Sequence, residues 1–171
     1  MPVSELSHEE QQELIDDIRD FAGRNADYYL KRWAPVLLGR RRLCGFNPAA
    51  FVFGIFWFAY RKMYFMIVMV LFISVIMSPI ERQLLAWFHY RGSEQTVSTV
   101  SALTLSSIAG VFGNRIYLWH ALRKIDRVRR GGLSAAERGR RLARVGGVSL
   151  VSGLAIPFLV FALVAVAYLL D

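Results

Sequence analysis

Three long stretches without a charged side chain or a histidine dominate this sequence. They run from Met63 to Pro79, from Val97 to Asn114 and from Val145 to Leu170. A helix of about 18 or more apolar residues is long enough to cross a hydrocarbon core roughly 30 Å thick. The first stretch reaches this length only if it extends slightly at one end. We therefore predict an all-α membrane protein with one transmembrane helix in each stretch.

The basic residues alternate along the chain in a way that predicts how it crosses the membrane. Of the 21 lysines and arginines, residues 1–62 hold nine, 81–96 hold two, 115–144 hold ten, and the remaining tail holds none. Segments rich in Lys and Arg stay in the cytoplasm. This pattern predicts a cytoplasmic N-terminus and a C-terminus outside. It also accounts for the net charge of +8, so we expect no nucleic-acid partner.

A helical arm is predicted at residues 1–45, before the first apolar stretch. Ser7 and Glu10 fit a capping box that begins a helix. Apolar side chains then recur at helical spacing on one face, and acidic residues occupy the opposite face. We interpret the arm as amphipathic and cytoplasmic, either lying on the membrane surface or docking a partner protein.

The segment from Phe46 to Tyr64 is unusually rich in aromatic side chains and carries two adjacent cations near its end. Its apolar part, residues 49–60, rises about 18 Å as a helix and is too short to cross the membrane. We predict an interfacial or re-entrant helix here. The predicted membrane domain, 46–171, comprises this helix at 46–62, transmembrane helices at 63–80, 97–114 and 145–170, and a basic cytoplasmic loop at 115–144.

Aromatic and cationic side chains near the cytoplasmic ends of the first two transmembrane helices form a candidate lipid-headgroup site. Aromatic rings beside Lys or Arg at headgroup depth can bind a phosphate through the cation and pack against the rest of the lipid. The same pattern is also typical of an aromatic belt with snorkelling cations. The candidate residues are Trp57, Tyr60, Arg61, Lys62, Tyr64, Asn114, Arg115 and Tyr117.

Small residues on the second and third predicted transmembrane helices indicate close helix packing. Residues four apart share one helix face, and small side chains there let two backbones approach closely in a bilayer. Such packing serves equally well within one chain or between chains. The residues are Ser98, Ala102, Ser106, Gly110, Gly113 and Gly153.

No arrangement of residues in this sequence predicts catalysis. The histidines His8, His89 and His120 fall in three separate segments without metal-ligand spacing, and no glycine-rich phosphate-binding motif occurs. We expect neither an enzyme nor a bound metal or cofactor. The uncharged apolar stretches also argue against a transporter or channel, which usually places ionisable groups within the membrane.

Two runs of residues resemble a family of small bacterial inner-membrane proteins of unknown function. They are FNPAAFVFGIFWFAYRKMY at 46–64 and GVFGNRIYLWHALRKI at 110–125. The family pattern is Asn-Trp-x-Ala-Phe, then Phe-Trp-x-x-Tyr-Arg-Lys-Met-Tyr, then Asn-x-x-Tyr. Matching residues include Asn47, Ala50, Phe51, Trp57, Tyr60, Arg61, Lys62, Met63, Tyr64, Asn114 and Tyr117, while Pro48 stands at the Trp position. The resemblance implies a bacterial cytoplasmic membrane protein and no particular activity.

From these features we expect a non-enzymatic, multi-pass inner-membrane accessory or scaffold protein. It would pack with a membrane partner or as a homo-oligomer. One alternative is a protein that binds anionic phospholipid headgroups in the cytoplasmic leaflet. A second alternative is a small transporter or channel, which would need several copies of the chain.

Overall fold

The computed structural model describes residues 7–89 and 92–170, and the regular structure within them is entirely helical. In chain order it comprises α1 (His8–Ala22), the 3-10 turn η2 (Gly23–Asn25), α2 (Ala26–Leu37), α3 (Pro48–Phe53), α4 (Ile55–Tyr60), α5 (Tyr64–Trp87), α6 (Glu94–Arg129), α7 (Ala135–Val145) and α8 (Leu150–Leu170). Three helical stretches are long and apolar enough to cross a membrane, namely Tyr64–Trp87, Gln95–Arg129 and Ala135–Ala162. The prediction of an all-α protein with three membrane-length helices is confirmed.

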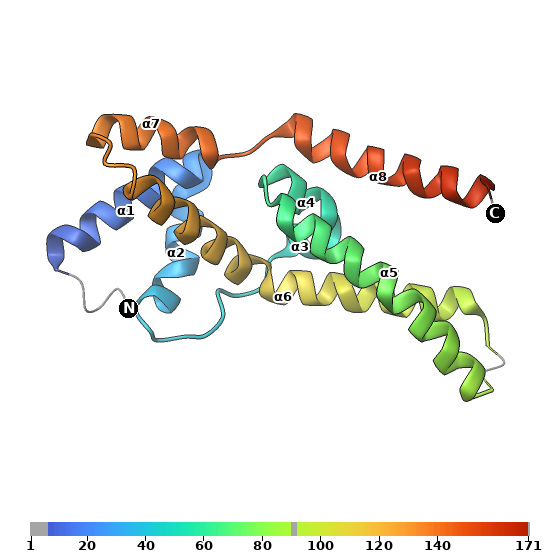
Figure 1. Ribbon diagram of the computed structural model, residues 1–171. Helices are drawn as coiled ribbons and strands as arrows, with labels where there is room; N and C mark the ends of the chain where they lie inside the picture. Colours follow the sequence, from blue (N-terminus) through green and yellow to red (C-terminus); the bar gives the residue numbers. More distant parts are fainter. Residues whose placement is uncertain (1–6, 90–91, 171) are drawn as a thin grey trace.

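The helices separate into two parts, which we call the base and the head (Figure 1). The base consists of α5, residues 94–114 of α6, and α8, which extend to the same side of the molecule. The head consists of α1, α2, α7 and residues 115–129 of α6, which gather at the opposite side. Helix α6 has 36 residues and is about 54 Å long at 1.5 Å per residue. It therefore belongs to both parts.

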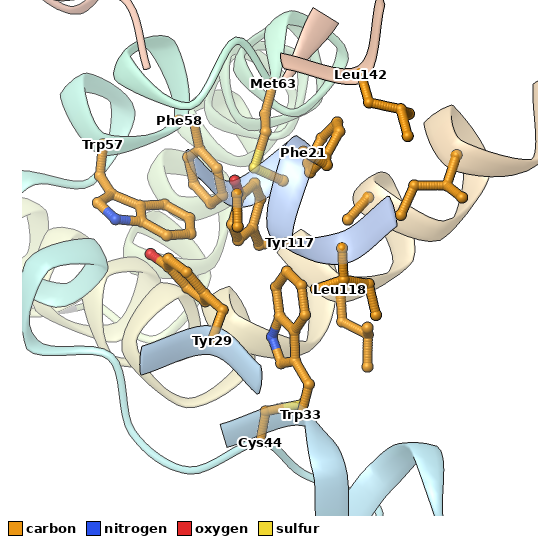
Figure 2. Packing of buried hydrophobic residues seen from close by; sticks show 14 of the residues in the cluster. Phe21, Tyr29, Trp33, Cys44, Trp57, Phe58, Met63, Tyr117, Leu118 and Leu142 are labelled. Carbon is orange, nitrogen blue, oxygen red and sulfur yellow. The ribbon is translucent and has the colours of Figure 1, made fainter. Parts of the chain in front are cut away.

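The core of the head is a cluster of aromatic side chains from three helices (Figure 2). Tyr29 and Trp33 of α2 lie against Tyr117 of α6, with ring centroids 4.8 and 5.3 Å from the Tyr117 ring. Phe21 of α1 approaches the same ring at 6.1 Å. Such spacings are typical of favourable tilted and edge-to-face ring pairs. The segment predicted as an arm is thus packed on α6.

The aromatic segment before α5 forms two short helices, where the sequence predicted one. Asn47 begins α3, because its side-chain oxygen accepts a hydrogen bond from the Ala50 amide at 3.0 Å and Pro48 occupies the first turn. The helix then breaks at Gly54, whose φ of 45° lies in the left-handed region. Helix α4 follows and packs along α8, where Gly153 faces the Tyr60 side chain.

The third apolar stretch begins with a turn. Helix α7 ends at Val145, and the apolar helix α8 begins at Leu150, later than the helix predicted at 145–170. Gly147 has φ of 63°, and its amide donates to the carbonyl oxygen of Phe21 at 2.7 Å. The turn therefore joins the start of the third apolar stretch to α1.

Replacing Gly146 with alanine should destabilise the protein by about 1–3 kcal/mol, the range for overpacking. A methyl group at this position would overlap the backbone carbonyl oxygen of Phe21, which cannot move without displacing α1. The melting temperature in detergent micelles measures the effect. Gly139→Ala in α7 is the matched control, because its methyl group would meet only the flexible end of the Asp20 side chain. Equal melting temperatures for wild type and Gly146→Ala would contradict the tight contact.

Candidate functional site

The eight residues predicted as a headgroup site are divided into a buried and a more exposed group. Trp57, Arg61, Asn114 and Tyr117 are buried, and Arg61 is only 4% exposed. Tyr60 and Lys62 are half-buried, whereas Tyr64 and Arg115 are exposed. The buried group lies where the base meets the head. We call Tyr29, Asn47, Arg61, Asn114 and Tyr117 the polar junction.

Arg61, three residues before α5 of the base begins, contacts two helices of the head. Its Nη2 donates to the hydroxyl of Tyr29 at 2.8 Å, and its Nη1 donates to the hydroxyl of Tyr117 at 3.4 Å. The guanidinium carbon also lies 4.7 and 5.0 Å from the centroids of these two rings. Arginine stays charged in proteins, so this is a buried cation stabilised by ring faces and hydroxyls.

No carboxylate of the described residues lies within ion-pair distance of Arg61, and its Nε has no hydrogen-bond partner there. The Tyr29 hydroxyl does not provide a negative charge either. Burial raises the pKa of Tyr29 to about 12, although the charge of Arg61 opposes the shift. Tyr29 is therefore neutral at physiological pH, and no anion among the described residues compensates the charge of Arg61.

Asn114 takes part in a second set of buried contacts in the junction. Its side-chain oxygen accepts a hydrogen bond from Asn47 Nδ2 at 2.9 Å, and its own Nδ2 donates to the Gly45 carbonyl at 3.2 Å. The indole nitrogen of Trp33 donates to the backbone carbonyl of Asn114 at 3.1 Å. Buried amides are costly unless they are hydrogen-bonded. These contacts satisfy Asn114 inside the chain and fix the start of α3 against α6.

The less buried Lys62 and Tyr64 contact α7 and α8. Lys62 Nζ donates to the backbone carbonyls of Arg144 and Gly146, at 3.0 and 2.7 Å, at the end of α7. A cation is favourable there because the last carbonyls of a helix lack partners and carry partial negative charge. The Tyr64 hydroxyl lies 3.0 Å from Ser152 Oγ on α8. The structure thus brings Trp57, Tyr60, Arg61 and Tyr117 together and places Lys62, Tyr64 and Arg115 outside that group.

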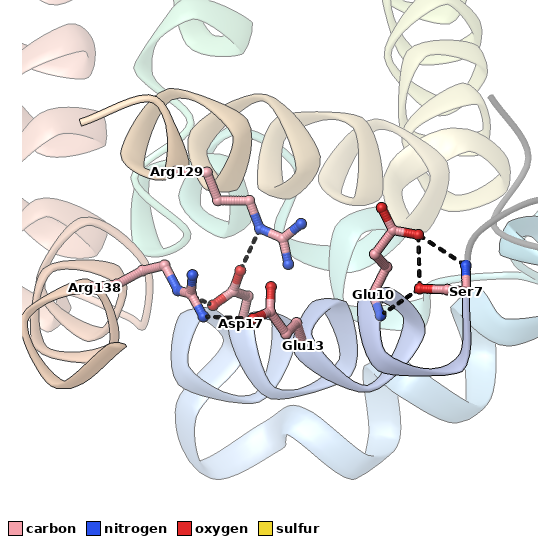
Figure 3. Close-up of polar contacts among 6 residues, drawn as sticks. All are labelled: Ser7, Glu10, Glu13, Asp17, Arg129 and Arg138. Atoms are coloured by element: carbon pink, nitrogen blue, oxygen red, sulfur yellow. Dashed lines mark hydrogen bonds and ion pairs between the residues drawn. The ribbon is translucent and has the colours of Figure 1, made fainter. Parts of the chain in front are cut away.

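Sequence reasoning missed a buried acidic residue, Asp17, which joins three helices of the head (Figure 3). Asp17 of α1 is 2% exposed. Its carboxylate accepts hydrogen bonds from Arg129 Nε of α6 at 2.5 Å and from Arg138 Nε of α7 at 3.0 Å. Its position could have indicated this role, since it lies three residues after Leu14 and four before Phe21 on the buried face of α1.

Only some of the predicted packing residues contact another segment of the chain. A side chain at Gly110 would overlap the ring of Phe46, and one at Gly113 would meet the methyl group of Ala50. These glycines therefore serve packing of α6 against the segment around α3, within one chain. Ser98 and Ala102 are exposed and Ser106 is half-buried. The half of the small-residue stripe nearer the start of α6 is not covered by the described part of the chain.

The fold and the junction define a class of protein. Its described residues form an all-helical chain with three helical stretches long and apolar enough to cross a membrane. Buried polar side chains connect the head to these stretches. Residues 8–123 match the family described as "Protein of unknown function (DUF2628)", and the chain belongs to this family. The expected membership of an uncharacterised family is confirmed, whereas the signature pattern itself stays a prediction. No curated protein and no solved structure matches the chain.

The junction is chemically suited to holding helices together. Its polar side chains are buried and engage one another. Among residues 7–89 and 92–170, no three histidine, cysteine, aspartate or glutamate side chains gather as a metal site requires.

Proposed function

We propose that this protein is a non-enzymatic accessory or scaffold protein of the bacterial inner membrane. It would present its helical head at a fixed position above the cytoplasmic leaflet and pack through its base with a second copy or a membrane partner. The observation that carries this proposal is the fixed connection between head and base. Arg61 contacts Tyr29 and Tyr117 in the head, and Lys62 contacts the end of α7.

The proposed orientation follows from charge. The segments rich in Lys and Arg, residues 1–62 and 115–144, contain the whole head. The positive-inside rule then favours a cytoplasmic head, an external connection between α5 and α6, and an external C-terminus. In this arrangement α3 and α4 lie at the cytoplasmic interface. The apolar side of α1 faces the head core, and its exposed acidic residues Glu9 and Asp16 are available to a partner protein.

The uncovered small residues at the start of α6 support association through the base. Ser98 and Ala102 are exposed in the single chain, although small residues at this spacing permit close helix contact in a bilayer. A second copy of the chain or a partner helix would bury this surface. Gly110, in contrast, already contacts Phe46 within the chain.

The association is tested by adding bulk to this face of α6. We expect the wild-type protein in mild detergent to have a mass above that of one chain. Ala102→Leu with Ser106→Leu should shift it to the single-chain mass, because larger side chains separate the helices. Native mass spectrometry measures this directly.

The matched control is Thr104→Leu with Ser107→Leu, which adds similar bulk to the other side of the same helix. Thr104 and Ser107 are exposed, and their hydroxyls donate only to backbone carbonyls one turn earlier. The control should keep the wild-type mass. A wild-type protein that is already a single chain, or equal effects of the two pairs, would refute association through this face.

A further inference from the structure

A pocket with basic walls lies between the start of α5 and the part of α6 that belongs to the head. Its volume is about 310 Å³, and its walls include four cations, Lys62, Arg123, Lys124 and Arg127, and no carboxylate. No carboxylate of the described residues lies within ion-pair distance of the three α6 cations. The nearby acid Asp126 is paired with Arg130. No carboxylate of the described residues therefore neutralises the three α6 cations, whereas Lys62 is held by the carbonyls at the end of α7.

The pocket continues toward α7. A second cavity of about 430 Å³ shares Lys124 and Arg127 with the first and adds Arg141 of α7. Its other walls are apolar or glycine, and it too lacks a carboxylate. A strip of cations separated by apolar side chains fits a ligand that has both an anionic group and apolar parts.

The depth at which the first pocket would lie in the membrane indicates the kind of ligand. The contact between Arg61 and the hydroxyl of Tyr117, at 3.4 Å, places Tyr117 beside the start of α5. Trp119 and Arg123 follow on α6, about 3 and 9 Å further along the helix axis. The headgroup layer extends roughly 5–8 Å beyond the hydrocarbon core on each side. If α5 crosses the membrane, the start of α5 and Trp119 therefore lie within the headgroup layer, and the long side chain of Arg123 can reach back into it.

Two aromatic side chains at this pocket also fit the interface. Trp119 and Tyr64 line it, and the guanidinium of Arg123 lies 4.2 Å from the centroid of the Trp119 ring. This stacking orients the Arg123 cation beside an indole ring, and such rings prefer the membrane interface.

We infer that this basic pocket binds the phosphate group of an anionic phospholipid from the cytoplasmic leaflet. The site lies at Lys62, Arg123, Lys124 and Arg127, and not at the buried Arg61, Asn114 and Tyr117. The inference rests on the proposed membrane orientation but not on the proposed association with a partner. Lys62 fixes one wall of the pocket, because its ammonium group donates to the carbonyls at the end of α7. The α6 cations contact the phosphate.

The inference is tested with the full chain in an uncharged detergent, titrated with phosphatidylglycerol or with phosphatidylcholine of the same acyl chains. Native mass spectrometry counts the bound lipid. We expect the wild type to prefer phosphatidylglycerol. Lys124→Gln with Arg127→Gln should weaken its binding by about 30-fold, because each near-surface cation contributes about fivefold. Arg123→Gln alone should give a smaller loss in the same direction.

The matched control is Arg24→Gln with Arg140→Gln, which removes the same charge from exposed positions of the head outside both cavities. It should bind phosphatidylglycerol as the wild type does. Equal loss in both double variants, or no loss in either, would overturn the site. Inorganic phosphate or a nucleic acid that displaces the lipid at equal concentration would overturn the choice of a lipid. The mass of the protein assembly, read in the same spectra, reports on the proposed association separately.

Discussion

Replacing Arg61 with alanine should lower the free energy of unfolding by about 3–5 kcal/mol, which is a large part of the stability of a typical domain. The change removes two hydrogen bonds and leaves the hydroxyls of Tyr29 and Tyr117 without their buried donor. It also empties the space between two helices of the head and the start of α5. The head should then separate from the base.

Arg61→Met is the informative companion variant. It keeps much of the side-chain volume and removes a buried charge that no carboxylate of the described residues neutralises. Apolar replacements of buried charges are often neutral or even stabilising, so we expect Arg61→Met to cost much less than Arg61→Ala. If Arg61→Met were as destabilising as Arg61→Ala, the cation itself would be required and the packing account of the junction would be wrong.

The single cysteine of the chain, Cys44, provides the measurement. It is 3% exposed, and burial raises the pKa of its thiol, with Arg115 opposing the shift. Alkylation needs an accessible thiolate, so its rate in the folded protein reports how often this region opens. Cys44 should react much faster in Arg61→Ala than in the wild type and only slightly faster in Arg61→Met.

Replacing Asp17 with alanine should cost about 3 kcal/mol, near the lower end for breaking a buried ion pair. The carboxylate pairs with both Arg129 and Arg138, and its loss leaves Arg129 without a carboxylate partner among the described residues and Arg138 with only Glu13, at 3.9 Å. The side chains of these arginines are 31% and 22% exposed, so water relieves part of the penalty. The melting temperature in micelles, together with Cys44 alkylation, measures the loss.

Asp16→Ala is the matched control for this prediction. Asp16 is exposed on the next position of α1, where a substitution usually changes stability by no more than about 0.5 kcal/mol. The two single variants have the same chemistry and differ only in burial. Similar stabilities of Asp16→Ala and Asp17→Ala would show that the contacts of Asp17 contribute nothing beyond a surface charge.

The sequence predicts local features of the fold better than the contacts between distant residues. The capping box of Ser7 and Glu10 is present, and most of each uncharged stretch lies in a helical stretch long enough to cross a membrane. Each of these depends on residues close together in the chain. The break at Gly54 was harder to predict, because glycine within a helical pattern is often tolerated.

The candidate site was only partly predictable for a physical reason. Aromatic residues beside Arg61 fit a lipid-facing belt, a headgroup site or a buried cage, and the three differ only in which helix covers them. In the structure Tyr29 covers Arg61 and makes the buried cage. Tyr29 lies 32 positions earlier in the chain, so the local pattern around Arg61 does not contain it. Arg123 and Arg127, whose spacing is that of an ordinary basic helix, become a pocket only because Lys62 and the start of α5 lie opposite.

Hydrogen exchange of the wild-type protein in detergent micelles, read peptide by peptide, tests most directly whether the head is one folded unit fixed on α6, the helix that it shares with the base. We expect the amides around Trp33 in α2 and around Tyr117 in α6 to exchange equally slowly, because they share one buried cluster and open together. The opposite result is rapid exchange throughout residues 8–37 while residues 110–125 stay protected. That result would mean that the first two helices form an independent arm, and it would contradict a scaffold with a fixed head.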